Sequence, residues 1–274
     1  MANSPTSTST VTGWFTPDVQ GGFAAVMARR EQPLLLGGIL VLVVLAWAYL
    51  AKGGGMTMTA NFALVLAMWW VMMVAMMLPS AAPAIMLYAR VRNSRGDAAT
   101  IAAPWLFLAG YLIAWGGFSA AAAAGQLALV NLSWIGAMTL RASTPALVGG
   151  ALIAAGAYQL TPWKNACLSS CRSPAQFLTR HWRPGASGAV RLGLLHGAVC
   201  IGCCWLLMIL LFAGGVMNLA WVALLAGLVA VEKLASRGPL LSRWVGVGMI
   251  LGGVALGVVA AVVDSAIAAA PHAP

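Results

Sequence analysis

Long apolar runs, almost free of charged residues, constrain this chain more than any other feature. Apolar residues make up 62% of the 274 residues and charged residues only 7%, far from the balance of a soluble protein. Because a soluble fold needs charge to wet its surface, this composition argues against a soluble enzyme. A helix needs about 20 mostly apolar residues to cross the hydrocarbon core of a bilayer. We therefore expect an all-α, polytopic transmembrane helical bundle.

Seven apolar runs reach or approach the length of a membrane span. They lie at about 34–50, 62–88, 104–129, 145–161, 192–213, 216–232 and 243–263. The second run is too long for a straight crossing, and Pro79 and Pro83 predict a kink or an early end there. The stretch 131–141 is too polar to span and is expected at the surface. The predicted division is a polar N-terminal tail at 1–33, a transmembrane domain at 34–264 and a short C-terminal tail at 265–274.

The basic residues test the seven-span arrangement independently. With the N-terminus in the cytoplasm, 13 of the 15 Lys and Arg residues fall in cytoplasmic connections, and only Lys52 and Arg141 fall on the other side. Cytoplasmic connections of membrane proteins are enriched in Lys and Arg. The pattern predicts an inside N-terminus and an outside C-terminus. It also explains the basic balance by contact with the lipid bilayer, and argues against a nucleic-acid partner.

All five cysteines lie between positions 167 and 204. Cys167 and Cys171 form a CLSSC motif just after the fourth run. The fifth run contains CIGCC, and its helical periodicity places several side chains on one face. The members of that face are His196, Cys200, Cys203, Cys204 and Met208. The predicted topology puts both groups at the cytoplasmic side, where they are expected to meet.

Three interpretations of the cysteines remain open. Cysteine packs well as a small apolar residue, which needs no further function. A dithiol redox relay is also possible, because Cys200 and Cys203 have CxxC spacing. A metal site of thiolates and imidazole is the interpretation that we favour, although the spacing is not that of a zinc ribbon. A disulfide framework is disfavoured, because the cytoplasm keeps thiols reduced.

The second run adds a group of thioethers at the same predicted depth. It reads MWWVMMVAMMLPSAAP and contains Met68, Met72, Met73, Met76 and Met77. Residues four apart share a helical face, so three of these methionines line one stripe. They could simply fill gaps in the core. Together with the cysteines, however, they form a soft ligand set, which favours Cu(I) over magnesium, calcium or manganese. Zinc or another soft metal is a less favoured cofactor.

The sixth run carries two further candidates at opposite ends. Glu232 and Lys233 end it on the cytoplasmic side, and an ionisable residue at such a boundary is a functional candidate. An interfacial Glu232–Lys233 pair is the equally weighted alternative. Met217 begins the run on the outer side, as an exit contact or as packing. We find no phosphate-binding loop, paired carboxylates or Ser/His/Asp set in the sequence.

Three segments carry a family resemblance. MWWVMMVAMMLPSAAP, YQLTPWKNACLSSCRSP and LLHGAVCIGCCWLLMILLFAGGVMNLAWVALLAGLVAVEK resemble the bacterial family of predicted metal-binding integral membrane proteins, over roughly 62–233. That family includes copper chaperones that serve tyrosinase-type copper enzymes. The resemblance implies a bacterial inner-membrane protein. The metal-site residues that it implies are Met72, Met76, Met77, Cys167, Cys171, Cys200, Cys203, Cys204, Met208, Met217 and Glu232.

The sequence thus leads to one main hypothesis and two alternatives. The main hypothesis is a Cu(I)-binding membrane protein that acts as a copper chaperone or copper-handling transporter for a client such as a tyrosinase or oxidase. It is not expected to be an enzyme. The first alternative is a membrane thiol–disulfide oxidoreductase that uses Cys200 and Cys203. The second is a structural assembly subunit without a site of its own.

Overall fold

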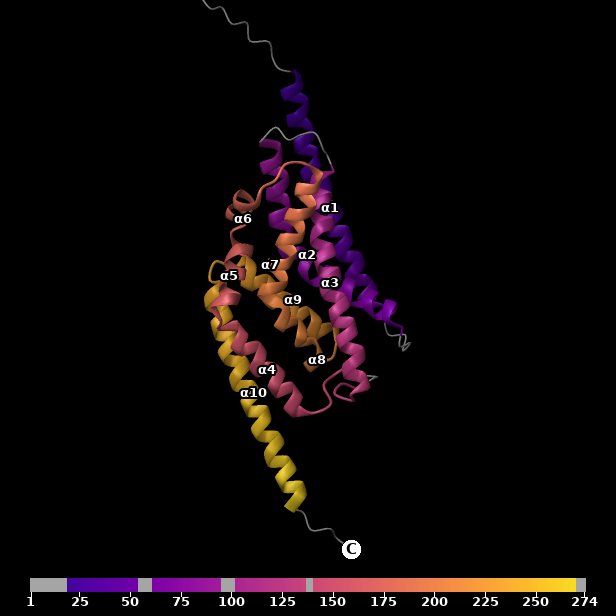
Figure 1. The fold of residues 1–274 in the computed structure, drawn as a ribbon, viewed down its shortest axis with the longest axis vertical. Coiled ribbons are helices and arrows are strands. Elements are labelled where there is room, and N and C mark those ends of the chain that lie inside the picture. Colours follow the sequence, from indigo (N-terminus) through magenta and orange to yellow (C-terminus); the bar gives the residue numbers. More distant parts are fainter. Residues whose placement is uncertain (1–18, 54–60, 95–101, 137–139, 270–274) are drawn as a thin grey trace, which may run out of the picture.

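The computed structural model describes residues 19–53, 61–94, 102–136 and 140–269, and within them the chain is helical without a strand. This confirms the predicted all-α class. The helices, shown in Figure 1, are α1 (Val19–Ala51), α2 (Phe62–Ser94), α3 (Ala103–Asn131), α4 (Pro145–Gln159), α5 (Pro162–Arg172), α6 (Pro174–His181), α7 (Gly185–Ile209), α8 (Leu211–Gly214), α9 (Leu219–Leu234) and α10 (Gly238–Ala269). Among them is a helix for each of the seven predicted spans.

Within the described residues, five helical segments are long and apolar enough to cross a membrane. They are Gln32–Ala51, Phe62–Arg92, Ala103–Asn131, Gly185–Gly214 and Gly238–Val263. Helices α4 and α9 have 15 and 16 residues, which give lengths of only about 22 and 24 Å at 1.5 Å per residue. A hydrocarbon core is about 30 Å thick. The seven-span count and the orientation therefore remain predictions.

Both ends of the helical region extend beyond the predicted boundaries. Helix α1 begins at Val19, inside the stretch 1–33 that the sequence predicts to be a tail. Helix α10 continues to Ala269, past the predicted boundary at 264. Once a helix is nucleated, each added residue gains a hydrogen bond, so a helix can continue beyond its apolar run.

Helix α2 does not end early at its prolines. It continues through Pro79 and Pro83 to Ser94. Pro79 has no N–H to donate to the carbonyl of Ala75 four residues earlier. The indole N–H of Trp47, on α1, donates to that carbonyl instead, at 3.2 Å. A neighbouring helix thus satisfies the backbone group that the proline leaves free, as is common in membrane helices.

Helices α3 and α7 pack backbone to backbone because glycines line their interface. A Cβ atom at Gly110 of α3 would collide with the carbonyl of Val190, and one at Gly193 of α7 with the carbonyl of Phe107. At Gly197 an added Cβ would lie 2.6 Å from the Cβ of Ala114. Small residues allow such close approach between membrane helices. The interface fixes the inner face of α7 beside α3.

A second glycine interface joins α4 to α10. Gly149 faces the carbonyl of Gly253, and Gly156 faces that of Gly246. Figure 1 shows α10 running alongside α4 and continuing away from the helices α1, α2, α3 and α7. Most of α10 is exposed, with large apolar side chains such as Leu251 and Val258 on its surface. That surface is suited to lipid.

Candidate metal centre

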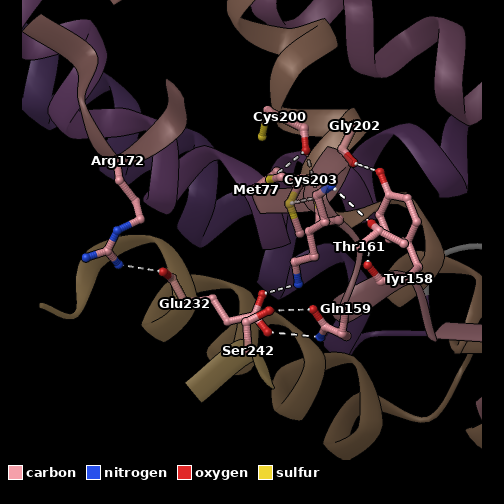
Figure 2. A network of polar contacts seen from close by, with 12 residues as sticks. Met77, Tyr158, Gln159, Thr161, Arg172, Cys200, Gly202, Cys203, Glu232 and Ser242 are labelled. Atoms are coloured by element: carbon pink, nitrogen blue, oxygen red, sulfur yellow. Dashed lines mark hydrogen bonds and ion pairs between the residues drawn. The ribbon is translucent and has the colours of Figure 1, made fainter. Parts of the chain in front are cut away.

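Helix α5 is fixed against α9. Its N-terminus is capped by Thr161, whose hydroxyl accepts the backbone N–H of Lys164 at 3.2 Å. At its other end, Arg172 donates hydrogen bonds to the carbonyls of Glu232, Ala235 and Ser236, at 2.8, 2.5 and 2.9 Å. Figure 2 shows this guanidinium reaching the end of α9. Because a cation stabilises the C-terminus of a helix, Arg172 holds α5 in place by charge as well as by geometry.

The thiols of α5 meet those of α7. The thiol of Cys171 lies near enough to Cys200 and Cys203 to interact with both electrostatically, and the sulfur of Cys167 lies 2.9 Å from an ideal Cβ position on Gly202. Beside the Cys167 sulfur, the hydroxyl of Tyr158 donates a hydrogen bond to the carbonyl of Gly202 (Figure 2). The structure therefore confirms that the CLSSC motif folds back onto the CIGCC helix. All five cysteines are free thiols.

The two α5 cysteines are biased toward the neutral thiol. Donating hydrogen bonds to Cys200 and Cys203, together with burial, raises the pKa of the Cys171 thiol well above its usual value. Burial, and then the proximity of Cys203, raises the pKa of Cys167. Because a thiol must lose its proton to bind a metal ion, metal binding by either residue would release a proton.

The predicted face of α7 points into the protein. His196, Cys200, Cys203, Cys204 and Met208 are all buried. The thiols of Cys203 and Cys204 donate to the carbonyl of Cys200, at 3.1 and 3.0 Å. The helical period predicted this face correctly, because it depends only on local geometry.

Besides α5, helices α9 and α3 also contact Cys200. The ammonium Nζ of Lys233, on α9, lies 2.9 Å from its sulfur, and the hydroxyl of Tyr111, on α3, lies 3.1 Å from the same atom. The Tyr111 hydroxyl also lies 3.2 Å from the carbonyl oxygen of Met77, to which it donates. Sequence reasoning selected neither Lys233 nor Tyr111 as a site residue. The sequence presents Lys233 only as a boundary residue and a possible partner of Glu232, and its burial beside Cys200 is visible only in the structure.

The methionines of α2 face the core. Met68, Met72, Met73, Met76 and Met77 are all at most 2% exposed, so none of them faces lipid. The thiol of Cys204 lies 3.8 Å from the thioether sulfur of Met77. Among the described residues, Met77 is therefore the α2 methionine whose sulfur contacts a cysteine. Met208 is buried one turn beyond Cys204 on α7.

Glu232 belongs to a separate polar network. Its two carboxylate oxygens accept from Gln159 at 2.9 Å and from Lys164 at 2.7 Å. Gln159 in turn accepts from Ser242 at 2.8 Å (Figure 2). The network, which we call the anchor, joins α4, α5, α9 and α10. The Glu232–Lys233 pair left open by the sequence does not form, because adjacent residues on a helix point about 100° apart.

Met217 lies away from the thiols. It precedes α9, whereas Lys233 is at the other end of that helix, roughly 20 Å along the axis. Met217 is only partly buried against the apolar core. The structure therefore does not bring Met217 to the cysteines.

Comparison with known proteins places the chain in a family. Residues 66–256, well over half of the chain, match the model of the PpoB2 family, described as copper chaperone. The chain belongs to this copper chaperone family. The match confirms the resemblance and extends it past position 233 into α10. No curated protein and no solved structure matches the chain.

Every cysteine and all of the sulfur contacts described above lie within the region that matches this family. His196 also lies there, with its Nδ1 buried and without a hydrogen-bond partner in the described part of the chain. The rings of Phe107, Tyr111 and Phe177 surround it at centroid distances of 5.9, 5.9 and 5.3 Å. Among the residues that the structure describes, no group of three or more His, Cys, Asp or Glu side chains is arranged to hold a metal ion.

Proposed function

We propose that this protein is a membrane copper chaperone that takes up Cu(I) where α5 lies on α7 and passes it to a copper enzyme. The observation that carries the proposal is the packing of the α5 cysteines on α7, with the Cys167 sulfur against Gly202 and Cys171 near Cys200 and Cys203. These thiols come from two helices and converge inside a protein whose family handles copper. Thiolates are preferred ligands of Cu(I).

The candidate ligands differ in how well they are placed. Cu(I) accepts few ligands, so we propose that a pair of thiols from α5 and α7 holds the ion. The thioether of Met77, at 3.8 Å from Cys204, supplies a weaker position beside them. Several weak positions in series suit transfer better than storage. His196, Cys167 and the buried methionines Met72, Met76 and Met208 are candidates for such positions, and Met217 for an exit contact.

Glu232 has a different role in this proposal. Both of its carboxylate oxygens already accept hydrogen bonds from Gln159 and Lys164. We infer that it anchors α5 to α9 and thereby holds Cys171 near Cys200. In this proposal Glu232 does not bind copper itself, and it affects copper binding only by holding α5 in position.

We propose that the protein lies in the bacterial inner membrane with its N-terminus and the thiols toward the cytoplasm. Arg172 and Lys233, at the thiol end of the bundle, belong to the 13 basic residues that this orientation places inside. The cytoplasm keeps thiols reduced, which leaves them free to bind metal. A copper enzyme such as a tyrosinase or an oxidase is the proposed client.

The test is the metal content of detergent-purified, reduced protein, measured by mass spectrometry with and without added Cu(I). The control variant changes Cys200, Cys203 and Cys204 to Ser, which keeps side-chain size nearly constant and removes the sulfur. We expect near-stoichiometric copper in the wild type and its loss in the variant. Copper retained by the variant would contradict the site.

The same sample separates the alternatives. Absence of metal from both proteins, with cysteines oxidised in pairs, would favour the thiol oxidoreductase. Absence of metal with reduced cysteines, and full client activation by the Ser variant, would favour an assembly subunit.

A further inference from the structure

Lys233 is a buried cation without a buried anion. Its side chain is 6% exposed, and its Nζ lies 2.9 Å from the sulfur of Cys200 and 3.4 Å from the hydroxyl of Ser80. Within the described part of the chain it makes no ion pair with a carboxylate, since the neighbouring Glu232 pairs with Lys164. Buried charges are normally paired. A buried lysine that has a sulfur and a hydroxyl as its neighbours, and no carboxylate, therefore needs an explanation.

The lysine faces a whole group of thiols. Its Nζ contacts the sulfur of Cys200, which belongs with Cys171, Cys203 and Cys204 to a group that we call the thiol cluster. These side chains come from α5 and α7, whereas Lys233 comes from α9. Three helices thus place one fixed positive charge beside four potential thiolate ligands.

The charge of a metal–thiolate complex explains this arrangement. Two thiols and one Cu(I) ion give a dithiolate complex of charge −1 and two protons, which leave to water. Burying a single negative charge in a weakly polar interior is costly unless an opposite charge lies close by. The Lys233 ammonium makes the complex neutral, and a metal-bound thiolate sulfur keeps lone pairs that can still accept its hydrogen bond.

We propose that Lys233 is the fixed counter-charge of the thiol cluster and selects a singly charged soft ion over a doubly charged one. The proposal rests on the function proposed above and adds the basis of its metal preference. A dithiolate complex of a divalent ion is already neutral, so Lys233 would give it an uncompensated charge of +1. Selection by charge is needed, because thiolates alone also bind divalent soft metals.

The test compares Cu(I) with Cd(II) in three proteins: wild type, Lys233→Met and Lys233→Arg. Affinities are measured without oxygen, in detergent, by competition with a chelator for each ion. We expect Lys233→Met to weaken Cu(I) binding by about 10- to 100-fold, as for loss of one hydrogen bond to a charged group. Its Cd(II) affinity should stay constant or rise. Lys233→Arg keeps the charge and should retain most of the preference for Cu(I).

Two results would overturn the proposal and leave the copper function intact. One is unchanged Cu(I) affinity in Lys233→Met. The other is an equal loss for both ions, which would mean that Lys233 only supports the local structure. By contrast, a folded wild type that binds no Cu(I) would refute the proposed function itself. Thermal unfolding of each variant, followed by tryptophan fluorescence, verifies that the comparison is made on folded protein.

Discussion

Two buried lysines of this protein lie in neighbouring regions and meet opposite surroundings. Lys164, in the anchor, is fully buried and pairs with the carboxylate of Glu232 at 2.7 Å. Lys233, adjacent in sequence to Glu232, instead faces the thiol cluster and lies 2.9 Å from the sulfur of Cys200. In the anchor, the positive charge of Lys164 is balanced by Glu232. The positive charge of Lys233 is balanced by the negative copper–dithiolate complex that we propose.

The contrast shows how a single helix can serve stability and binding at once. Adjacent residues of α9 point in different directions, so Glu232 faces α4 and α5 while Lys233 faces α7. A self-compensated pair contributes to the fold whether or not metal is present. A cation beside the thiol cluster can change its contribution when the thiols bind an ion.

The largest expected effect is on stability, in the anchor. Lys164→Met leaves the buried carboxylate of Glu232 without its cation, which costs about 3–5 kcal/mol. For a chain of this size we expect the thermal midpoint in detergent to fall by roughly 10 °C. Lys233→Met, which breaks no ion pair with a carboxylate, should lower the midpoint by less.

A double variant gives this prediction its control. Lys164→Met combined with Glu232→Met replaces the pair by apolar side chains, and such replacements are often neutral or stabilising. Its midpoint should recover, and its copper stoichiometry should match the wild type if Glu232 anchors α5 and does not bind copper. Lost copper in a stable double variant would show that Glu232 is a ligand.

A smaller effect distinguishes the two cysteines of α5. Cys171 interacts electrostatically with Cys200 and Cys203, whereas Cys167 lies beside Gly202. We therefore expect Cys171→Ser to weaken Cu(I) binding by about tenfold or more, the equivalent of roughly 1.4 kcal/mol. Cys167→Ser, one turn away on the same helix, is the matched control and should change affinity by less than about threefold. Equal losses in both would mean that α5 binds copper in another register.

Much of this architecture follows from the sequence, since it depends on local periodicity. The apolar runs predict the helices, and the 3.6-residue period places Cys200, Cys203 and Cys204 on one buried face. The positive-inside pattern even predicts that Cys171 meets that face, because it puts both motifs at the same end of the bundle.

The pairing of charges could not be predicted in the same way. Glu232 and Lys233 are neighbours in sequence, but Glu232 meets partners from α4 and α5, and Lys233 meets partners from α7 and α2. Which partner each residue meets depends on how α5 docks onto α9, through the contacts of Arg172 with the end of that helix. Docking of this kind is tertiary and has no periodic signal in the sequence.

X-ray absorption at the copper edge of the Cu(I)-loaded protein tests the central claim most directly. The claim is that thiols from α5 and α7 hold Cu(I) together. We predict the edge of Cu(I) with a first shell of sulfur, and partial replacement of that shell by oxygen or nitrogen in Cys171→Ser. A first shell of oxygen and nitrogen alone in the wild type, or a spectrum unchanged by Cys171→Ser, would contradict it.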